Sequence, residues 1–250
     1  KVNHIQPRKL MGEGVSTDIL YRNNGNLTFT DVSKEAGILI EGYSLGLAVS
    51  DLNNDQWPDM YISNDFIGND ILYINNQDGT FTNRAAEYFK HTSFAGMGND
   101  IADINNDGLL DVIELDMRPE DNARQKLIIP PTGYDKFQLS LRIGYEAQFT
   151  RNTLQLNRGN NTFSEISFLS GISSTDWSWS ALAADYDNDG DMDLIAANYG
   201  SGTLSVFKNN GDGTFAAKVD YGTGSSPYSV VSSDVDGDGD MDLIAANNSS

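Results

Sequence analysis

The sequence predicts an all-β fold, a β-propeller built from four-stranded blades of about 50 residues with calcium-binding hairpin loops. Three observations predict it: a repeated glycine-turn element, a repeated acidic nonapeptide, and the spacing that the two elements keep. Self-similarity at a period of this length is typical of solenoids and propellers. The chain has 250 residues with 11 Phe, 11 Tyr and 3 Trp, enough large apolar groups for a folded core.

The two repeated elements stay in step along the chain. The turn element begins with Asn-Asn or a variant and ends in Thr-Phe, at Phe29, Phe81, Phe163 and Phe215. The nonapeptides begin at Asp51, Asp103, Asp185 and Asp234. Both elements recur after 52 residues and then after 82, so the second interval carries a 30-residue insertion. Two independent markers that keep the same distances indicate one repeating structural unit.

Each unit is predicted to contain four short strands. Apolar runs rich in β-formers precede and follow the acidic loop, as in GLAVSD and DMYIS. A third run, DILYINN, leads through the Asp78-Gly79 turn into TFTN, and four such strands make one propeller blade. The predicted boundaries are a half blade at 18–31, whole blades at about 44–85, 96–166 and 178–219, a half blade at 227–250, and an insertion at about 116–148.

The half blades at the two ends leave three arrangements open. Exposed strand edges are an aggregation hazard unless they are paired. The ends could complete each other in a closed ring, another chain could complete them by head-to-tail assembly, or the chain could be part of a longer protein. We expect a processed or truncated N-terminus because the chain begins at Lys1, and no segment reads as a signal peptide or a membrane span.

Charge and cysteine content exclude several classes of function. The 36 Asp and Glu outnumber the 16 Lys and Arg, which gives a formal net charge of −20. This excess argues against nucleic acid and anionic membranes as partners, because both need clustered basic residues. The absence of Cys excludes disulfides, thiolate zinc sites and cysteine nucleophiles.

The nonapeptides have the pattern of a calcium-binding loop. They read DLNNDQWPD, DINNDGLLD, DYDNDGDMD and DVDGDGDMD, with oxygen-bearing side chains at positions 1, 3, 5 and 9. Calcium takes six to eight oxygen ligands, and position 7 would add its backbone carbonyl. Position 6 is glycine in three loops, which allows a sharp bend, whereas Gln56 predicts a strained or different turn in the first. The flanking strands and the absence of a common glutamate at position 12 exclude an EF-hand.

These residues resemble FG-GAP/VCBS-repeat proteins, the calcium-binding propeller repeats also found in integrin α-subunit heads. FAGMGNDIADINNDGLLD at 94–111 is similar to the motif of that family, with Gly-Met-Gly in place of Gly-Ala-Pro. Residues 1 to about 193 resemble bacterial surface relatives of cartilage acidic protein, and the remainder resembles generic VCBS arrays. The resemblance implies a propeller, usually seven-bladed, with one calcium ion in each loop.

The resemblance also implies the ligands of about four calcium ions. The third and fourth sets hold more carboxylates than the first two, so we predict that they bind more tightly. The implied ligands are Asp51, Asn53, Asp55, Trp57 (carbonyl) and Asp59; Asp103, Asn105, Asp107, Leu109 (carbonyl) and Asp111; Asp185, Asp187, Asp189, Asp191 (carbonyl) and Asp193; and Asp234, Asp236, Asp238, Asp240 (carbonyl) and Asp242.

Other candidate chemistry is weaker, and we predict that the chain is not an enzyme. Gly42 to Gly46 matches the G-x-S-x-G pattern of hydrolases, but it precedes a repeat strand and does not turn from a strand into a helix. His4 and His91 belong to no catalytic or metal-binding spacing. For Trp177 and Trp179, packing between blades is favoured over a sugar site.

The insertion is the most individual part of the chain. Residues 116–158 hold seven Lys and Arg against five acids, together with four aromatic residues. Long insertions on rigid scaffolds often carry binding function, and the alternative is a packed segment that covers the propeller. We expect an extracellular or cell-surface module, from a bacterial source, that binds a protein or glycan ligand through this insertion. The alternative is a structural subunit that assembles head to tail through its half blades.

Overall fold

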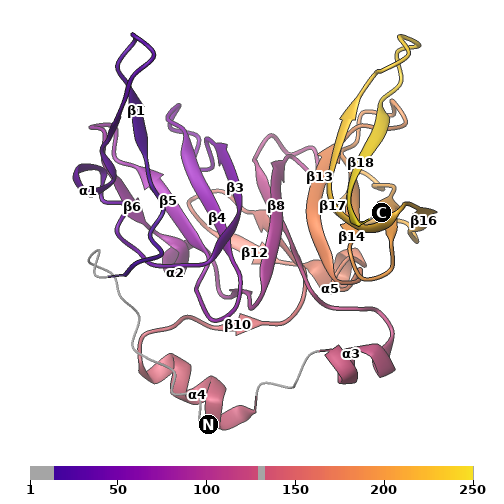
Figure 1. The fold of residues 1–250 in the computed structure, drawn as a ribbon, viewed down its shortest axis with the longest axis horizontal. Coiled ribbons are helices and arrows are strands. Elements are labelled where there is room, and N and C mark those ends of the chain that lie inside the picture. The colour runs from indigo at the N-terminus through magenta and orange to yellow at the C-terminus, as the bar shows by residue number, and fades with distance from the viewer. Residues whose placement is uncertain (1–13, 129–132, 250) are drawn as a thin grey trace.

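The computed structural model describes residues 14–128 and 133–249, whose strands form a row of antiparallel sheets (Figure 1). Sheet 1 consists of β3 (Ser44–Ser50), β4 (Asp59–Asn64), β5 (Ile71–Asn75) and β6 (Phe81–Asn83). Sheet 2 consists of β8 (Gly96–Ala102), β9 (Asp111–Asp116), β11 (Thr153–Asn157) and β12 (Phe163–Glu165). Sheet 3 consists of β13 (Ser178–Ala184), β14 (Asp193–Asn198), β15 (Thr203–Phe207) and β16 (Val219–Gly222). The prediction of an all-β fold made of repeated four-stranded units is confirmed.

Two strand pairs flank these sheets at opposite sides of Figure 1. The first pair is β1 (Tyr21–Asn23) with β2 (Phe29–Asp31), and the last is β17 (Ser225–Ser233) with β18 (Asp242–Ser249). Among the described residues, no strand hydrogen bond joins the first pair to the last. The closed ring of a propeller therefore stays a prediction.

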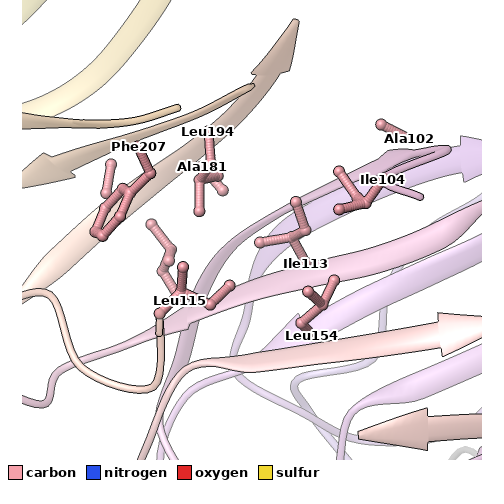
Figure 2. Close-up of a cluster of buried hydrophobic side chains, with 10 residues drawn as sticks. Ala102, Ile104, Ile113, Leu115, Leu154, Ala181, Leu194 and Phe207 are labelled. Atoms are coloured by element: carbon pink, nitrogen blue, oxygen red, sulfur yellow. The ribbon is translucent and has the colours of Figure 1, made fainter. Parts of the chain in front are cut away.

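Each interface between neighbouring sheets has its own hydrophobic core. The core between sheets 2 and 3 gathers Ile113, Leu115 and Leu154 from one side and Leu194 and Phe207 from the other (Figure 2). Successive side chains of a strand point to opposite faces of the sheet. A strand that lies between two cores must therefore be apolar on both of its faces. In β14, Leu194 and Ala196 face this core, whereas Ile195 and Ala197 face the core shared with β17 and β18.

The first strands of adjacent sheets pack closely and share one irregularity. Each of β3, β8, β13 and β17 carries a β-bulge near its start. Gly98 follows the bulge of β8, and a Cβ atom there would lie 2.6 Å from the carbonyl oxygen of Trp179 in β13. Only glycine permits this approach of two backbones, which explains a glycine of the Gly-Met-Gly segment physically.

Helices are short and lie outside the sheets. One-turn helices α1 (Ser33–Ala36), α2 (Ala85–Tyr88) and α5 (Ser167–Ser170) each follow the last strand of a unit, and their four residues are too few to show a helical period. The insertion forms α3 (Asn122–Ile128) and α4 (Tyr134–Arg142). Its end is held by a parallel pairing of β7 (Thr92–Ser93) with β10 (Gln148–Phe149). In the described part of the chain, no helix has the length and apolar character needed to cross a membrane.

Candidate metal centres

The four nonapeptide loops lie at one end of the sheets. Each loop joins the first strand of a unit to the second, as between β8 and β9. The insertion leaves from Asp116, which pairs with Gly96 at the opposite end of the same two strands. The tip of the β17–β18 hairpin and the helices α3 and α4 accordingly occupy opposite edges of Figure 1. The insertion therefore does not cover the acidic loops.

Backbone hydrogen bonds wrap each loop around its acidic side chains. The first aspartate accepts the backbone N–H of the sixth residue at 2.7, 2.8, 3.0 and 3.1 Å in loops 1 to 4. The fifth residue accepts the N–H of the seventh at 2.9 Å in the first loop and 3.0 Å in the third. The four loops thus share one backbone form.

Gln56 adopts the same turn as the glycines of the other loops. Its φ is 72°, compared with 83° for Gly108, 96° for Gly190 and 97° for Gly239. A residue with a side chain is strained in this region, so the first loop keeps the common form at a cost in backbone energy.

Carboxylates converge in the third and fourth loops. Oxygens of Asp185, Asp187 and Asp193 lie within 4.8 Å of one another, and those of Asp234, Asp236 and Asp242 do the same. The fifth-position carboxylates, Asp189 and Asp238, lie outside these groups and accept backbone N–H groups. In the first two loops position 3 is Asn53 or Asn105, whose amide donates to the fifth-position carboxylate at 3.0 Å. The donors are all oxygens, a set that suits a hard cation such as Ca²⁺.

The ninth-position aspartate anchors each loop to its sheet. Asp111 is fully buried and accepts two backbone N–H groups, from Ile104 at 2.9 Å and from Asn157 at 2.7 Å. Burial raises the pKa of Asp111 to about 7, and it also raises the pKa values of Asp59 and Asp193. A cation bound in the loop would offset this desolvation, so the residues present fit calcium.

Buried asparagine side chains join neighbouring loops. The Asn157 amide donates to the carbonyl of Leu110 in its own loop at 3.1 Å and to that of Leu52 in the preceding loop at 3.2 Å. The Asn209 amide makes the equivalent bonds to Met192 at 2.9 Å and Ile104 at 2.8 Å. The sequence analysis does not identify these residues, although an Asn recurs at this place in each unit.

Two further hydrogen bonds connect the loops at their surface. The Asn106 amide donates to Asp191 at 2.5 Å, and the Asn188 amide donates to Asp240 at 2.8 Å. In both cases the fourth residue of one loop holds the seventh residue of the next. The side chain at position 7, which the calcium pattern leaves free, therefore has a structural role in the third and fourth loops.

At the insertion end, arginines lie against aromatic rings. The Arg151 guanidinium lies 4.7 Å from the ring centroid of Phe168 and 5.4 Å from that of Phe149, and it bonds Glu165 at 2.7 Å. Phe168 and its neighbour Leu169 in α5 are 61% and 76% exposed. The equivalent residues of α1 and α2 are Lys34, Glu35, Ala86 and Glu87, so this exposed apolar pair occurs once.

A buried pair of carboxyl groups lies between sheets 1 and 2. The Glu114 carboxyl is fully buried and accepts the Tyr61 hydroxyl at 3.0 Å, and the negative charge of Glu114 raises the pKa of the buried Asp70 carboxyl after burial itself. Burial raises the pKa of Glu114 to about 7 and that of Asp70 well above its usual range, so the pair shares a proton. Ile62 and Ala196 occupy the place of Glu114 in sheets 1 and 3.

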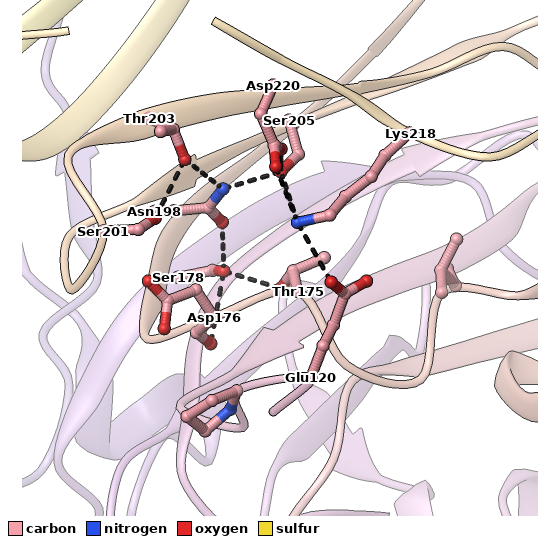
Figure 3. A network of polar contacts seen from close by, with 12 residues as sticks. Glu120, Thr175, Asp176, Ser178, Asn198, Ser201, Thr203, Ser205, Lys218 and Asp220 are labelled. Atoms are coloured by element: carbon pink, nitrogen blue, oxygen red, sulfur yellow. Dashed lines mark hydrogen bonds and ion pairs between the residues drawn. The ribbon is translucent and has the colours of Figure 1, made fainter. Parts of the chain in front are cut away.

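The insertion is tied to sheet 3 through a polar network (Figure 3). Lys218 pairs with Glu120 of the insertion at 3.3 Å and with Asp220 at 3.2 Å. Nearby, Arg124 of α3 pairs with the buried Asp176 at 2.8 Å. The first part of the insertion, through α3, is therefore held against sheet 3.

The other candidate catalytic or sugar-binding residues named from the sequence make contacts within the fold where the structure describes them. Ser44 is the first residue of β3 and donates to Asn64 at 3.1 Å, so the G-x-S-x-G match has no strand-to-helix turn. His91 contacts Arg151, and burial followed by that positive charge lowers the pKa of His91. His4 lies outside the described residues. Trp177 and Trp179 contact Tyr199, and Trp179 also contacts Tyr228 of β17, so Trp179 packs between sheet 3 and the last hairpin.

Comparisons with known proteins identify the repeat family. A family model for the FG-GAP-like repeat matches residues 51–113, 143–196 and 185–245, which together cover more than half of the chain. No curated protein matches.

Solved structures that match include a lectin of Agrocybe aegerita that recognises non-reducing terminal N-acetylglucosamine, at 17% identity over 96% of this chain with a TM-score of 0.45. Another is the V. cholerae biofilm matrix protein Bap1, at 16% identity over 98% of this chain with a TM-score of 0.43. The present chain spans 57% and 36% of those two chains. On the matched repeats, the chain belongs to the FG-GAP-like repeat family.

Proposed function

We propose that this chain is a calcium-stabilised recognition or adhesion module that works outside the cell or on the cell surface. The observation that carries the proposal is the set of four loops with one backbone form and an all-oxygen donor set. The residues that would hold the metal are the twenty ligands implied by the family resemblance, and a bound ion would neutralise the carboxylates that converge in the third and fourth loops. Extracellular modules bind calcium at about 0.1–1 mM, which the cytosol does not supply.

The insertion end is the proposed ligand surface, for a protein or a glycan. It combines the exposed pair Phe168 and Leu169 with the guanidinium groups of Arg118 and Arg151, both of which lie over the Phe168 ring. Aromatic rings and arginines supply much of the binding energy at recognition surfaces. The calcium loops, at the opposite end, would hold the sheets and leave this surface free.

Binding of the metal-loaded chain to protein and glycan arrays tests this function. We expect binding that is lost on calcium removal and weakened at least tenfold by the double substitution F168S/L169S. A matched control is L27S, which removes an exposed apolar side chain at the distant β1–β2 turn. If L27S weakened binding as much as F168S/L169S, or if no array ligand bound, the recognition proposal would be wrong.

Head-to-tail assembly is the second candidate function. The outward face of β3 exposes Leu45, Leu47 and Val49, and the β17–β18 hairpin exposes Val231 and Ile244. The β17–β18 pair of one chain and the β1–β2 pair of another could together form one four-stranded blade between the chains. The mass of the calcium-loaded chain in solution distinguishes the candidates, since a stable monomer at high concentration would exclude obligate assembly.

A further inference from the structure

The third loop differs from the other described loops because a lysine occupies its acidic cluster. Lys208 follows β15, and its ammonium group contacts the Asp187 carboxylate and lies 3.0 Å from the Asp189 carboxylate. Asp187 and Asp189 are the third and fifth residues of this loop. Two of its five implied calcium ligands thus already have a positively charged partner.

Equivalent positions in the other sheets are apolar. The residue after Lys208 is Asn209, and its backbone N–H donates to the ninth-position aspartate of the third loop. The backbone N–H groups of Asn75 and Asn157 make the same hydrogen bond in sheets 1 and 2. This register aligns Lys208 with Ile74 and Leu156, which are buried. Lys208 is 54% exposed, so its charged end can leave the loop for water without disturbing the sheet.

Calcium and the ammonium group compete for the same oxygens. A calcium ion needs the carboxylates that Lys208 contacts, and a displaced ammonium group still leaves a positive charge within a few ångströms of the ion. Either effect weakens calcium binding. The fourth loop has aspartates at the same five positions, and within the described residues no lysine contacts them.

We infer that Lys208 sets the calcium affinity of the third loop and makes it weaker than the fourth, despite their matching acidic residues. This inference rests on the proposed calcium sites and assigns them different roles. The fourth loop would stay filled over the extracellular calcium range, and the third would exchange its ion. Counting carboxylates alone predicts equal affinities, so the lysine is the residue that distinguishes the two loops.

Calorimetric titration of the full metal-free chain with Ca²⁺ tests the inference. The substitutions D185N and D234N identify the binding components of the third and fourth loops, since each weakens one loop and keeps an oxygen acceptor there. We expect K208M to tighten the third-loop component by about three- to tenfold, with a smaller gain at high salt. K208R keeps the charge and should bind like the unmodified chain.

The matched control is K218M, which changes the net charge equally but removes a lysine that pairs with Glu120 and Asp220. We expect K218M to leave the third-loop component unchanged within twofold. If K208M behaved like K218M, or bound calcium more weakly, the role of Lys208 would be wrong while the calcium sites stood. If neither D185N nor D234N altered the titration, the proposed calcium sites themselves would be wrong, and this inference with them.

Discussion

The two ends of the sheets carry different kinds of chemistry. At the loop end the same hydrogen bonds recur in each unit, such as the one from the sixth residue to the first aspartate. At the insertion end the distinctive features occur once: Glu114 replaces an apolar residue, and Phe168 and Leu169 replace polar or small ones. A repeated feature meets a need that every unit shares, which is holding neighbouring sheets together. A feature that occurs once marks a task performed at one place, as ligand recognition would be.

Calcium removal is expected to have the largest effect, because it acts on the repeated end. A ligand at 100 times its Kd stabilises a fold by about 2.7 kcal/mol per site, and four independent sites would give about 11 kcal/mol. Domain stability is typically about 5–15 kcal/mol, so the metal-free chain would be marginal. We expect EGTA to lower the melting temperature by about 20 °C or more. An unchanged melting curve, measured by circular dichroism, would contradict a stabilising role for calcium.

The substitution N209A is expected to have the next largest effect. It removes the buried amide that joins the second and third loops and leaves the carbonyls of Ile104 and Met192 without this donor. An unsatisfied buried polar group costs about 1–3 kcal/mol. The control N210A removes an exposed amide that donates to Thr214, and it should change the unfolding free energy by less than about 0.5 kcal/mol. If N209A and N210A lowered the unfolding free energy equally in chemical denaturation, the hydrogen bonds that join the loops would contribute nothing to stability.

The substitution E114Q tests the single buried carboxyl pair through pH. Folding raises the pKa of Glu114 from 4.5 to about 7, so the folded chain keeps a proton that the unfolded chain loses first. Glu114 should therefore contribute a fall in the unfolding free energy from about pH 4.5 to pH 7 that then levels off, at about 1.4 kcal/mol per pH unit at most for this one group.

E114Q should remove this contribution and make the pH slope shallower under saturating calcium, while the buried carboxyls of Asp70 and Asp116, whose pKa values burial also raises, keep a part of it. The exposed Glu35 provides the control, since E35Q removes the same charge outside the core. A slope in E114Q equal to that of the unmodified chain would show that Glu114 is not one of the titrating groups.

The smallest effect is expected for L169S at the insertion end. Leu169 is 76% exposed, and surface substitutions change the unfolding free energy by less than about 0.5 kcal/mol. If chemical denaturation showed that L169S lowers the unfolding free energy by about 2 kcal/mol or more, this residue would support the fold. The contrast between the two ends would then be weaker.

Periodicity made the repeated parts of the fold predictable. Two markers at equal spacing located the strands of sheets 1 to 3, and the alternation of aspartate with other residues located the loops. For Gln56 the sequence predicts a strained or a different turn, and the structure shows the strained one; the missing glycine alone does not show that the loop keeps its common form at a φ of 72°. The buried amides of Asn157 and Asn209 also escaped prediction, since asparagine is common in turns and nothing local shows which neighbouring loop it reaches.

The parts that occur once were less predictable for a physical reason. Glu114 lies in the run DVIEL, where strand alternation cannot show that the adjacent sheet offers Tyr61 and Asp70 as partners. Lys208 is not singled out by the sequence, because its contact with Asp187 depends on the distance between two segments about 20 residues apart. Such contacts follow from the packing of the units, which a single repeat does not contain.

The hydrogen bonds from Asn106 to Asp191 and from Asn188 to Asp240 have a mechanical consequence. They link loops 2, 3 and 4 in series along one edge, so a pull on the last hairpin reaches the middle sheet through the loops as well as through the cores. An ion that restricts the motion of one loop would then restrict its neighbours too, and the linked loops would resist bending together. For a chain anchored at one side and held by a ligand at the other, calcium concentration would set how much tension the row of sheets bears before the sheets separate.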